Sequence, residues 1–202
     1  MLDARLRPWI DPVLDRVGRP LAATGLRANH VTLLGFVVGL GAVPALAAGA
    51  FGLALALILA SRLLDGIDGA VARASAPTDF GGFLDIVCDF VFYAAVPLGF
   101  ALADPANALP ALFLVVSFMG TGASFLAYAA LAAKHGISTE LRGRKTFFYL
   151  GGLTEGFETI LAFALMCAFP RAFPLIAWIF GAMCWITTAS RVLAARAAFG
   201  ER

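Results

Sequence analysis

The sequence predicts an all-α integral membrane protein, with six transmembrane helices preceded by an amphipathic N-terminal interfacial helix. Composition is the first observation, because 61% of the 202 residues are hydrophobic and only 14% are charged. Mean hydropathy is +0.88. A soluble domain carries about 25% charged residues, so this chain has too few to cover a water-facing surface. The net charge of +2 is too small to indicate a nucleic-acid partner.

The first segment, 1–28, is predicted to lie on the membrane surface. Leu6, Ile10, Val13 and Val17 recur at helical spacing, with arginines and aspartates between them. Trp9 lies on the apolar side of the same helix. A charged face opposite an apolar face with a tryptophan is typical of interfacial helices. The alternative for this segment is a frayed, soluble terminus.

Residues 29–198 are predicted to form a six-helix membrane bundle, within one domain that spans 1–202. A transmembrane helix needs about 20 consecutive apolar residues, and the runs are divided by short polar segments. We expect the six spans at 31–49, 53–73, 81–103, 110–133, 147–169 and 173–190.

Orientation is predicted by the distribution of positive charge. The connections between the spans form two alternating sets. Of the 15 Lys and Arg residues, only Arg171 lies in the set formed by the turns at 49–52, 104–109 and 170–172. The other set comprises both termini, 62–78 and 134–145. Because positively charged connections stay in the cytoplasm, we expect that set to face the cytoplasm, across the inner membrane.

Four aspartates carry the strongest functional signal. Asp65 and Asp68 have i, i+3 spacing, and Asp85 and Asp89 have i, i+4 spacing, so each pair projects from one face of a helix. The two spans are consecutive and antiparallel, which would bring all four carboxylates together below the cytoplasmic interface. Uncompensated carboxylates are costly at that depth. Since hard oxygen ligands suit Mg²⁺, Mn²⁺ or Ca²⁺, the sequence predicts a cation site.

Small residues and an arginine follow the first pair of aspartates. Gly66, Gly69 and Ala72 remove side-chain bulk, so a ligand could approach the helix backbone closely. Arg73 offers a planar fork that suits a phosphate. Helix packing by small residues is the alternative. Together with the aspartates, these residues predict a binding site for a metal-bound pyrophosphate that carries a flat chemical group.

The segment resembles the signature of the CDP-alcohol phosphatidyltransferase family, D-x-x-D-G-x-x-A-R, a spacer, then G-x-x-x-D-x-x-x-D. Every fixed position is matched here, by Asp65, Asp68, Gly69, Ala72, Arg73, Gly81, Asp85 and Asp89. The resemblance implies a transferase of phospholipid biosynthesis. An alcohol would attack the phosphorus that bears the lipid of CDP-diacylglycerol, and CMP would leave. It also implies two divalent cations, Mg²⁺ or Mn²⁺, and a homodimer.

The resemblance assigns roles to these positions. Two metals would be held by Asp65, Asp68, Asp85 and Asp89, and Asp89 would also deprotonate the acceptor. The CDP moiety would be contacted by Gly69, Ala72, Arg73 and Gly81. Family members often carry P-N-x-x-T at the start of the first span, which here is matched only by Asn29 and Thr32, because Ala28 replaces the proline. Asn29 could equally be an ordinary helix N-cap.

Candidate residues for the acceptor are less specific. Basic residues in comparable places of the family can bind an acceptor's phosphate, and here these are Lys134, Arg142, Arg144, Lys145 and Arg191. Positive-inside charge explains each of them equally well. Glu155 and Glu158 are expected within the fifth span, where they would recognise a polyol or amine, or pair with Arg191.

A divalent-cation transporter is the alternative function. It would explain the four aspartates, but it would not explain the G-x-x-A-R element or the grouping of the polar residues on the cytoplasmic side.

Overall fold

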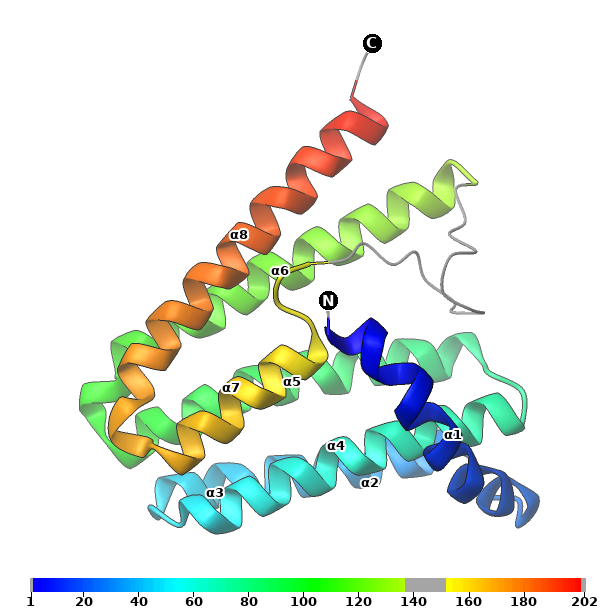
Figure 1. The fold of residues 1–202 in the computed structure, drawn as a ribbon, viewed down its shortest axis with the longest axis horizontal. Helices are drawn as coiled ribbons and strands as arrows, with labels where there is room; N and C mark the ends of the chain where they lie inside the picture. Colours follow the sequence, from blue (N-terminus) through cyan, green and yellow to red (C-terminus); the bar gives the residue numbers. More distant parts are fainter. Residues whose placement is uncertain (1, 137–151, 201–202) are drawn as a thin grey trace.

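The computed structural model describes residues 2–136 and 152–200, and the side chains from residue 8 onward within those ranges. The described residues are helical, without a strand (Figure 1). The elements in chain order are α1 (Leu2–Ala23), α2 (Ala28–Leu40), α3 (Ala42–Ala47), α4 (Phe51–Ala74), α5 (Asp79–Ala103), η1 (Pro105–Asn107), α6 (Ala108–Lys134), α7 (Gly156–Ala168), η3 (Pro170–Ala172) and α8 (Phe173–Phe199).

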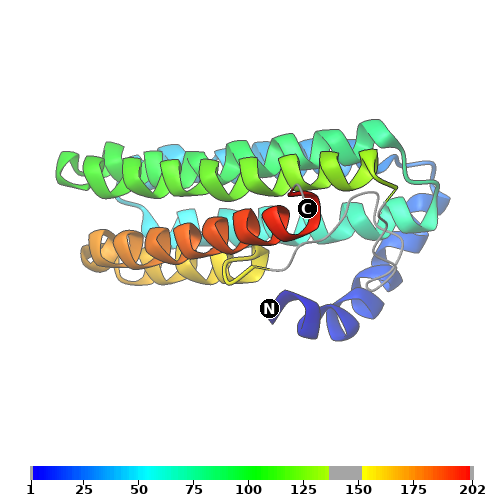
Figure 2. The ribbon, with the colours of Figure 1, turned by 90° about the horizontal axis from the view of Figure 1, so that it is seen from above.

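The long helices pack in two layers, which Figures 1 and 2 show from perpendicular directions. Helices α2, α5 and α6 form one layer, and α4, α7 and α8 form the other. The layers meet where α2 contacts α4 and where α6 contacts α8. Helix α1 lies outside both layers, against α4.

The core between the layers is rich in phenylalanine. Phe92 of α5 contacts Phe163 of α7 edge-on, with 6.2 Å between ring centroids. Phe118 of α6 contacts the same ring at 6.1 Å. Further along, Phe100 stacks on Phe173 of α8 at 4.4 Å. Such aromatic pairs add to the stabilisation from area burial, so they fix α5 against α7 and α8 where the two layers meet.

Four helical segments are long and apolar enough to cross a membrane, among the described residues. They are Ala28–Ala47, Asp79–Ala103, Pro105–Lys134 and Pro170–Phe199. The first is broken at Gly41 between α2 and α3, where Pro44 cannot donate a hydrogen bond to the preceding turn. The protein is therefore a membrane protein, but the expected count of six spans is not confirmed.

The two other predicted spans differ from these four for different reasons. Helix α4 has 24 residues, but its second half carries Arg62, Asp65, Asp68 and Arg73. Helix α7 has only 13 residues. The prediction of a helix from 147 is wrong for the described part of that range, because the helix begins at Gly156, and residues 147–151 lie outside the described residues.

Helix α1 packs closely on α4 through small residues. A Cβ at Gly18 would lie 2.5 Å from the Cβ of Ala70, and a Cβ at Gly66 would lie 2.8 Å from Cδ1 of Leu14. Leu14 of α1, rather than a ligand, lies against Gly66 in this structure. Small residues that let helices approach closely are a common device in membrane proteins.

Candidate active site

Three of the four signature aspartates form one group. Asp65 and Asp68 lie on α4 and Asp85 lies on α5, and each offers a carboxylate oxygen within 4.8 Å of the other two. Oδ2 of Asp68 is buried and has no hydrogen-bond partner among the described residues. Buried carboxylate oxygens without partners are costly. A hard divalent cation fits this donor set, because it prefers oxygen ligands and would satisfy the orphaned oxygen.

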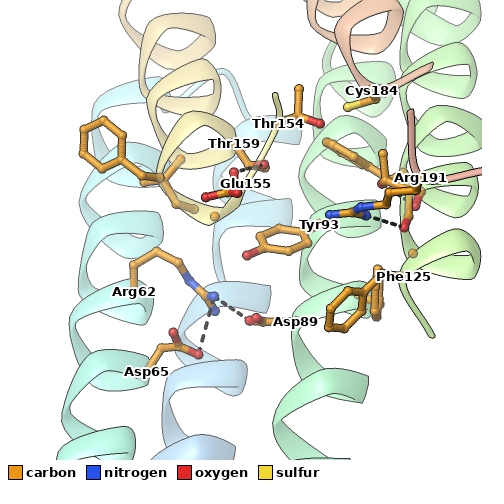
Figure 3. Close-up of a pocket in the computed structure, with 17 residues that line it drawn as sticks. Arg62, Asp65, Asp89, Tyr93, Phe125, Thr154, Glu155, Thr159, Cys184 and Arg191 are labelled. Atoms are coloured by element: carbon orange, nitrogen blue, oxygen red, sulfur yellow. Dashed lines mark hydrogen bonds and ion pairs between the residues drawn. The ribbon is translucent and has the colours of Figure 1, made fainter. Parts of the chain in front are cut away.

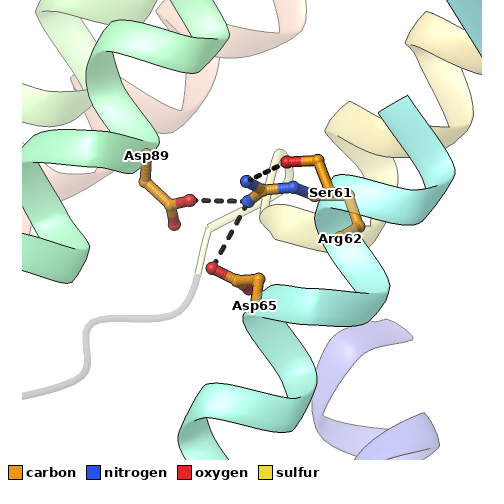
Figure 4. Close-up of polar contacts among 4 residues, drawn as sticks. All are labelled: Ser61, Arg62, Asp65 and Asp89. Atoms are coloured by element: carbon orange, nitrogen blue, oxygen red, sulfur yellow. Dashed lines mark hydrogen bonds and ion pairs between the residues drawn. The ribbon is translucent and has the colours of Figure 1, made fainter. Parts of the chain in front are cut away.

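Asp89 points to a different partner. Its Oδ1 lies 2.5 Å from Nη1 of Arg62, and the same nitrogen lies 3.6 Å from Oδ1 of Asp65 (Figure 4). Asp89 is thus next to the group of Asp65, Asp68 and Asp85 without belonging to it. The assignment of Asp89 as fourth metal ligand and base stays a prediction.

Arg62 is the main addition that the structure makes to the predicted site. It lies outside the signature positions, which begin at Asp65. The available signal was its i, i+3 spacing from Asp65, which places both residues on one face of α4. Nothing in the sequence connects Arg62 with Asp89, because that contact joins two helices.

Arg73 contacts α1 in this structure. Its Nη2 and Nε donate hydrogen bonds to Oδ1 of Asp15 at 2.7 Å and 3.2 Å, and Oδ1 of Asp11 lies 4.0 Å from Nη2. A Cβ at Gly69 would lie 3.4 Å from Nη1 of Arg73, an ordinary contact distance, so Gly69 lies beside this guanidinium. Ala72, which directly precedes Arg73 in α4, is half-buried.

Gly81 brings the start of α5 against the start of α2. A Cβ there would lie 3.0 Å from Oδ1 of Asn29 and equally close to Oγ1 of Thr78, which caps α5 by accepting a hydrogen bond from the Gly81 amide. The capping alternative for Asn29 is wrong, because the N-cap of α2 is Arg27 and Asn29 lies within the helix. Thr32 is buried, and its hydroxyl donates to the carbonyl of Ala28 at 3.1 Å.

A cavity of about 460 Å³ lies between the two layers and reaches the carboxylates (Figure 3). Arg62, Asp65 and Asp89 line one end. The rest of the polar lining comes from α5, α6, the segment before α7, α7 and α8, and comprises Tyr93, Thr121, Thr154, Glu155, Thr159 and Arg191. Sequence reasoning missed Tyr93 and the threonines, since no spacing relates residues on separate helices.

The two glutamates of the predicted fifth span have different positions. Glu155 is the N-cap of α7 and forms a capping box with Glu158, so the expectation that both lie inside a helix is wrong for Glu155. Its Oε1 accepts a hydrogen bond from the amide of Gly152 at 3.1 Å. Glu155 lines the cavity with Arg191, whereas Glu158 is not among the lining residues.

The remaining basic candidates are only partly described. Arg191 is buried and donates from Nη1 to the carbonyl of Thr121 at 2.8 Å. Lys134 is the last residue of α6. Arg142, Arg144 and Lys145 lie outside the described residues.

Apolar helices, three grouped aspartates beside a cavity and the signature residues around them together define a class of membrane transferase. A family model for CDP-alcohol phosphatidyltransferases matches residues 25–193, and the chain belongs to that family. It is therefore a CDP-alcohol phosphatidyltransferase.

Individual relatives agree with this assignment. The chain is 55% identical over 193 residues to inner membrane protein YnjF of Escherichia coli (strain K12), covering 95% of this chain and 94% of the relative. It is 29% identical over 195 residues to archaetidylinositol phosphate synthase of Pyrococcus horikoshii, covering 96% of each.

Solved structures show the same fold. The crystal structure of Mycobacterium tuberculosis phosphatidylinositol phosphate synthase (PgsA1) with CDP-DAG bound has a TM-score of 0.70 at 24% identity, covering 92% of this chain and 94% of that one. A second structure of that protein, in complex with manganese and citrate, has a TM-score of 0.66 at 25% identity, covering 89% and 87%.

Proposed function

We propose that this enzyme transfers the phosphatidyl group of CDP-diacylglycerol to the hydroxyl of a polar alcohol in phospholipid biosynthesis, with release of CMP. The observation that carries the proposal is the position of the group formed by Asp65, Asp68 and Asp85, which lies beside a cavity that also contains Asp89. A phosphoryl transfer needs charge neutralisation and an acceptor site side by side, and this arrangement provides room for both.

Two divalent cations, Mg²⁺ or Mn²⁺, would be held by Asp65, Asp68, Asp85 and Asp89. When bound, they would neutralise the pyrophosphate and the charge that develops on the attacking and leaving oxygens. Asp89 would accept the proton of the acceptor hydroxyl while the oxygen of that hydroxyl bonds to the lipid-bearing phosphorus. The bond from that phosphorus to the CMP oxygen breaks, and CMP leaves with the electron pair.

The CDP moiety would bind where the end of α4 meets the starts of α2 and α5. The residues proposed to contact it are Gly69, Ala72, Arg73, Gly81, Asn29 and Thr32. The close approach of Gly81 to Asn29 supports the grouping. Arg73 is half-exposed on its side chain, so its fork could exchange the carboxylate of Asp15 for a phosphate.

The acceptor would bind in the cavity between the layers, next to Asp89. Arg191 and Glu155 are its charged residues away from the aspartates, and hydroxyls of Thr121, Thr154 and Thr159 suit a molecule with several hydroxyl groups. Further acceptor contacts are proposed for Lys134, Arg142, Arg144 and Lys145, whereas Glu158 lies outside the cavity lining and is proposed to cap α7. The family's range of acceptors leaves the choice of alcohol to experiment.

In the membrane, we propose one domain, 1–202, that crosses the inner membrane six times as a homodimer. Both α4 and α7 would cross beside the apolar helices, with the charges of α4 turned toward the cavity. The termini and the site would face the cytoplasm. Helix α1 would lie at the interface, and its exposed Trp9, Ile10, Val13 and Val17 support that position.

The test is an acceptor screen with the purified protein. The protein in nanodiscs is incubated with CDP-diacylglycerol, Mn²⁺ or Mg²⁺, and one alcohol at a time, including inositol phosphate, glycerol phosphate, inositol and serine. We expect cation-dependent CMP release together with a new phospholipid that contains one of these alcohols. Absence of CMP release with every alcohol would contradict the proposal.

A further inference from the structure

We infer that Arg62 is a positioning residue for this reaction, which holds the carboxylate of Asp89 at the wall of the acceptor cavity. The inference rests on the proposed function and concerns a residue outside the signature. Arg62 and Asp89 both line the cavity and are joined by the 2.5 Å contact between Nη1 and Oδ1. The partner Asp89 is the residue expected to take the acceptor's proton.

The surroundings of Arg62 hold its guanidinium in one place. The guanidinium of Arg62 lies over the ring of Phe92, with its Cζ atom 4.3 Å from the ring centroid. Nη2 donates a hydrogen bond to Oγ of Ser61 at 3.2 Å. Only 15% of the side chain is exposed. An arginine that stacks on an aromatic ring and donates from both ends of its fork has little freedom to turn.

The backbone nearby is shaped to allow this arrangement. A Cβ at Gly39 of α2 would lie 2.6 Å from Oγ of Ser61 and 2.8 Å from Cδ2 of Phe92. Any larger residue at position 39 would displace the two groups on which the guanidinium depends. Three helices, α2, α4 and α5, therefore contribute to the site that fixes Arg62.

Charge balance alone does not require this contact. An arginine equally distant from the aspartates would balance their charge as well. Instead, Nη1 of Arg62 lies nearer to Asp89 than to Asp65, at 2.5 Å against 3.6 Å. The oxygens of Asp65, Asp68 and Asp85 remain within 4.8 Å of one another. The effect of Arg62 is thus to fix the carboxylate of Asp89 at the cavity wall, beside the group formed by the other three.

The test compares Arg62→Gln and Arg62→Lys with a matched control, Arg171→Gln. The control removes an exposed arginine of η3 that does not line the cavity. Two quantities are measured: Mn²⁺ affinity by electron paramagnetic resonance without substrates, and steady-state CMP release with the alcohol that the acceptor screen identifies. A misplacement of about 1 Å in a reacting group can cost about 100-fold in rate.

For Arg62→Gln we expect kcat to fall about 10- to 100-fold, with KM for CDP-diacylglycerol and the Mn²⁺ affinity of the site formed by Asp65, Asp68 and Asp85 each within about threefold of wild type. Arg62→Lys keeps the charge but loses the fork, so its kcat should lie between those of Arg62→Gln and wild type. The control should match wild type in every measurement.

Two results would overturn the inference while leaving the proposed function standing. One is an unchanged kcat in both Arg62 variants. The other is a parallel loss of Mn²⁺ affinity, thermal stability and kcat in both, which would make Arg62 a structural counter-charge. Wild type that releases no CMP with any alcohol would instead overturn the proposed function, and the role of Arg62 with it.

Discussion

Arg62 and Arg73 lie on the same helix, and each contacts carboxylates of a different neighbour. Arg62 contacts Asp89 of α5, and Arg73 contacts Asp15 of α1. The sequence predicted that Arg73 would offer its fork to a phosphate bound beside the aspartates. Spacing places a residue on a face of a helix, but the partner of a long side chain depends on which helices lie beside that face.

Replacement of Arg73 by lysine tests its proposed contact with the donor. A point charge replaces a planar fork, so two-point binding of a phosphate is lost. We expect Arg73→Lys to raise KM for CDP-diacylglycerol about 10- to 100-fold, in line with the ~1.5–3 kcal/mol of a charged hydrogen bond, and to leave KM for the acceptor unchanged. Steady-state kinetics in which each substrate is varied decide the matter. A change limited to the acceptor would contradict the assignment.

At the scale of elements, the start of α7 explains why Glu155 and Glu158 differ. Residues 152–155 precede the helix, and Glu155 uses its side chain to cap it. In the segment E-G-F-E, Glu158 at the third helical position matches half of a capping box, but glutamate is not a usual N-cap residue. The long apolar run around it concealed that signal, because length and hydropathy alone predicted a continuous span.

The two glutamates therefore provide a matched pair of variants. Glu155→Gln keeps an oxygen that can accept the cap hydrogen bonds but removes the charge from the cavity. We expect it to raise the acceptor KM about tenfold, with KM for CDP-diacylglycerol unchanged. Glu158→Gln preserves the capping box, which glutamine also forms, and should lie within about twofold of wild type. Equal acceptor kinetics in both variants and wild type would end the assignment of Glu155 to the acceptor site.

The contact between α1 and α4 provides a second test at this scale. A side chain at Gly18 would meet backbone atoms of Ala70 and Val71 within 3 Å, so Gly18→Leu must push the helices apart. We expect a loss of about 1–3 kcal/mol, as for other overpacked sites, seen as a lower Tm and faster tryptic cleavage within α1. The control is Gly52→Leu, since a Cβ at Gly52 meets nothing within 4 Å. Equal Tm values would contradict close packing of α1.

The proposed orientation of the whole molecule can be tested by labelling. Two single cysteines, Ala76→Cys between α4 and α5 and Asp104→Cys after α5, are introduced after the buried Cys88, Cys167 and Cys184 are replaced. We expect an impermeant maleimide applied to intact cells to label position 104 and to leave position 76 unlabelled until the cells are opened. Labelling of position 76 from outside would reverse the topology.

The molecule as a whole was predictable to the extent that its signals are local. Periodicity and hydropathy predicted the all-α membrane class and most helix positions, and the spacing of Asp65, Asp68 and Asp85 predicted that their carboxylates meet. The role of Gly66, the partner of Asp89 and the threonines of the cavity were not predictable. The first and third depend on contacts between helices distant in sequence, and the partner of Asp89 depends on how α5 is rotated against α4, which residue spacing does not determine.

The most direct test of the central claim is Asp85→Asn, compared with Asp104→Asn at the opposite end of α5. The amide keeps the shape of the side chain but loses the charge that would hold a cation. With CDP-diacylglycerol, saturating Mn²⁺ and the identified alcohol, we predict CMP release near the wild-type rate for Asp104→Asn and a fall of about 100-fold or more for Asp85→Asn, with both proteins still folded in detergent. Wild-type CMP release by Asp85→Asn would contradict the account.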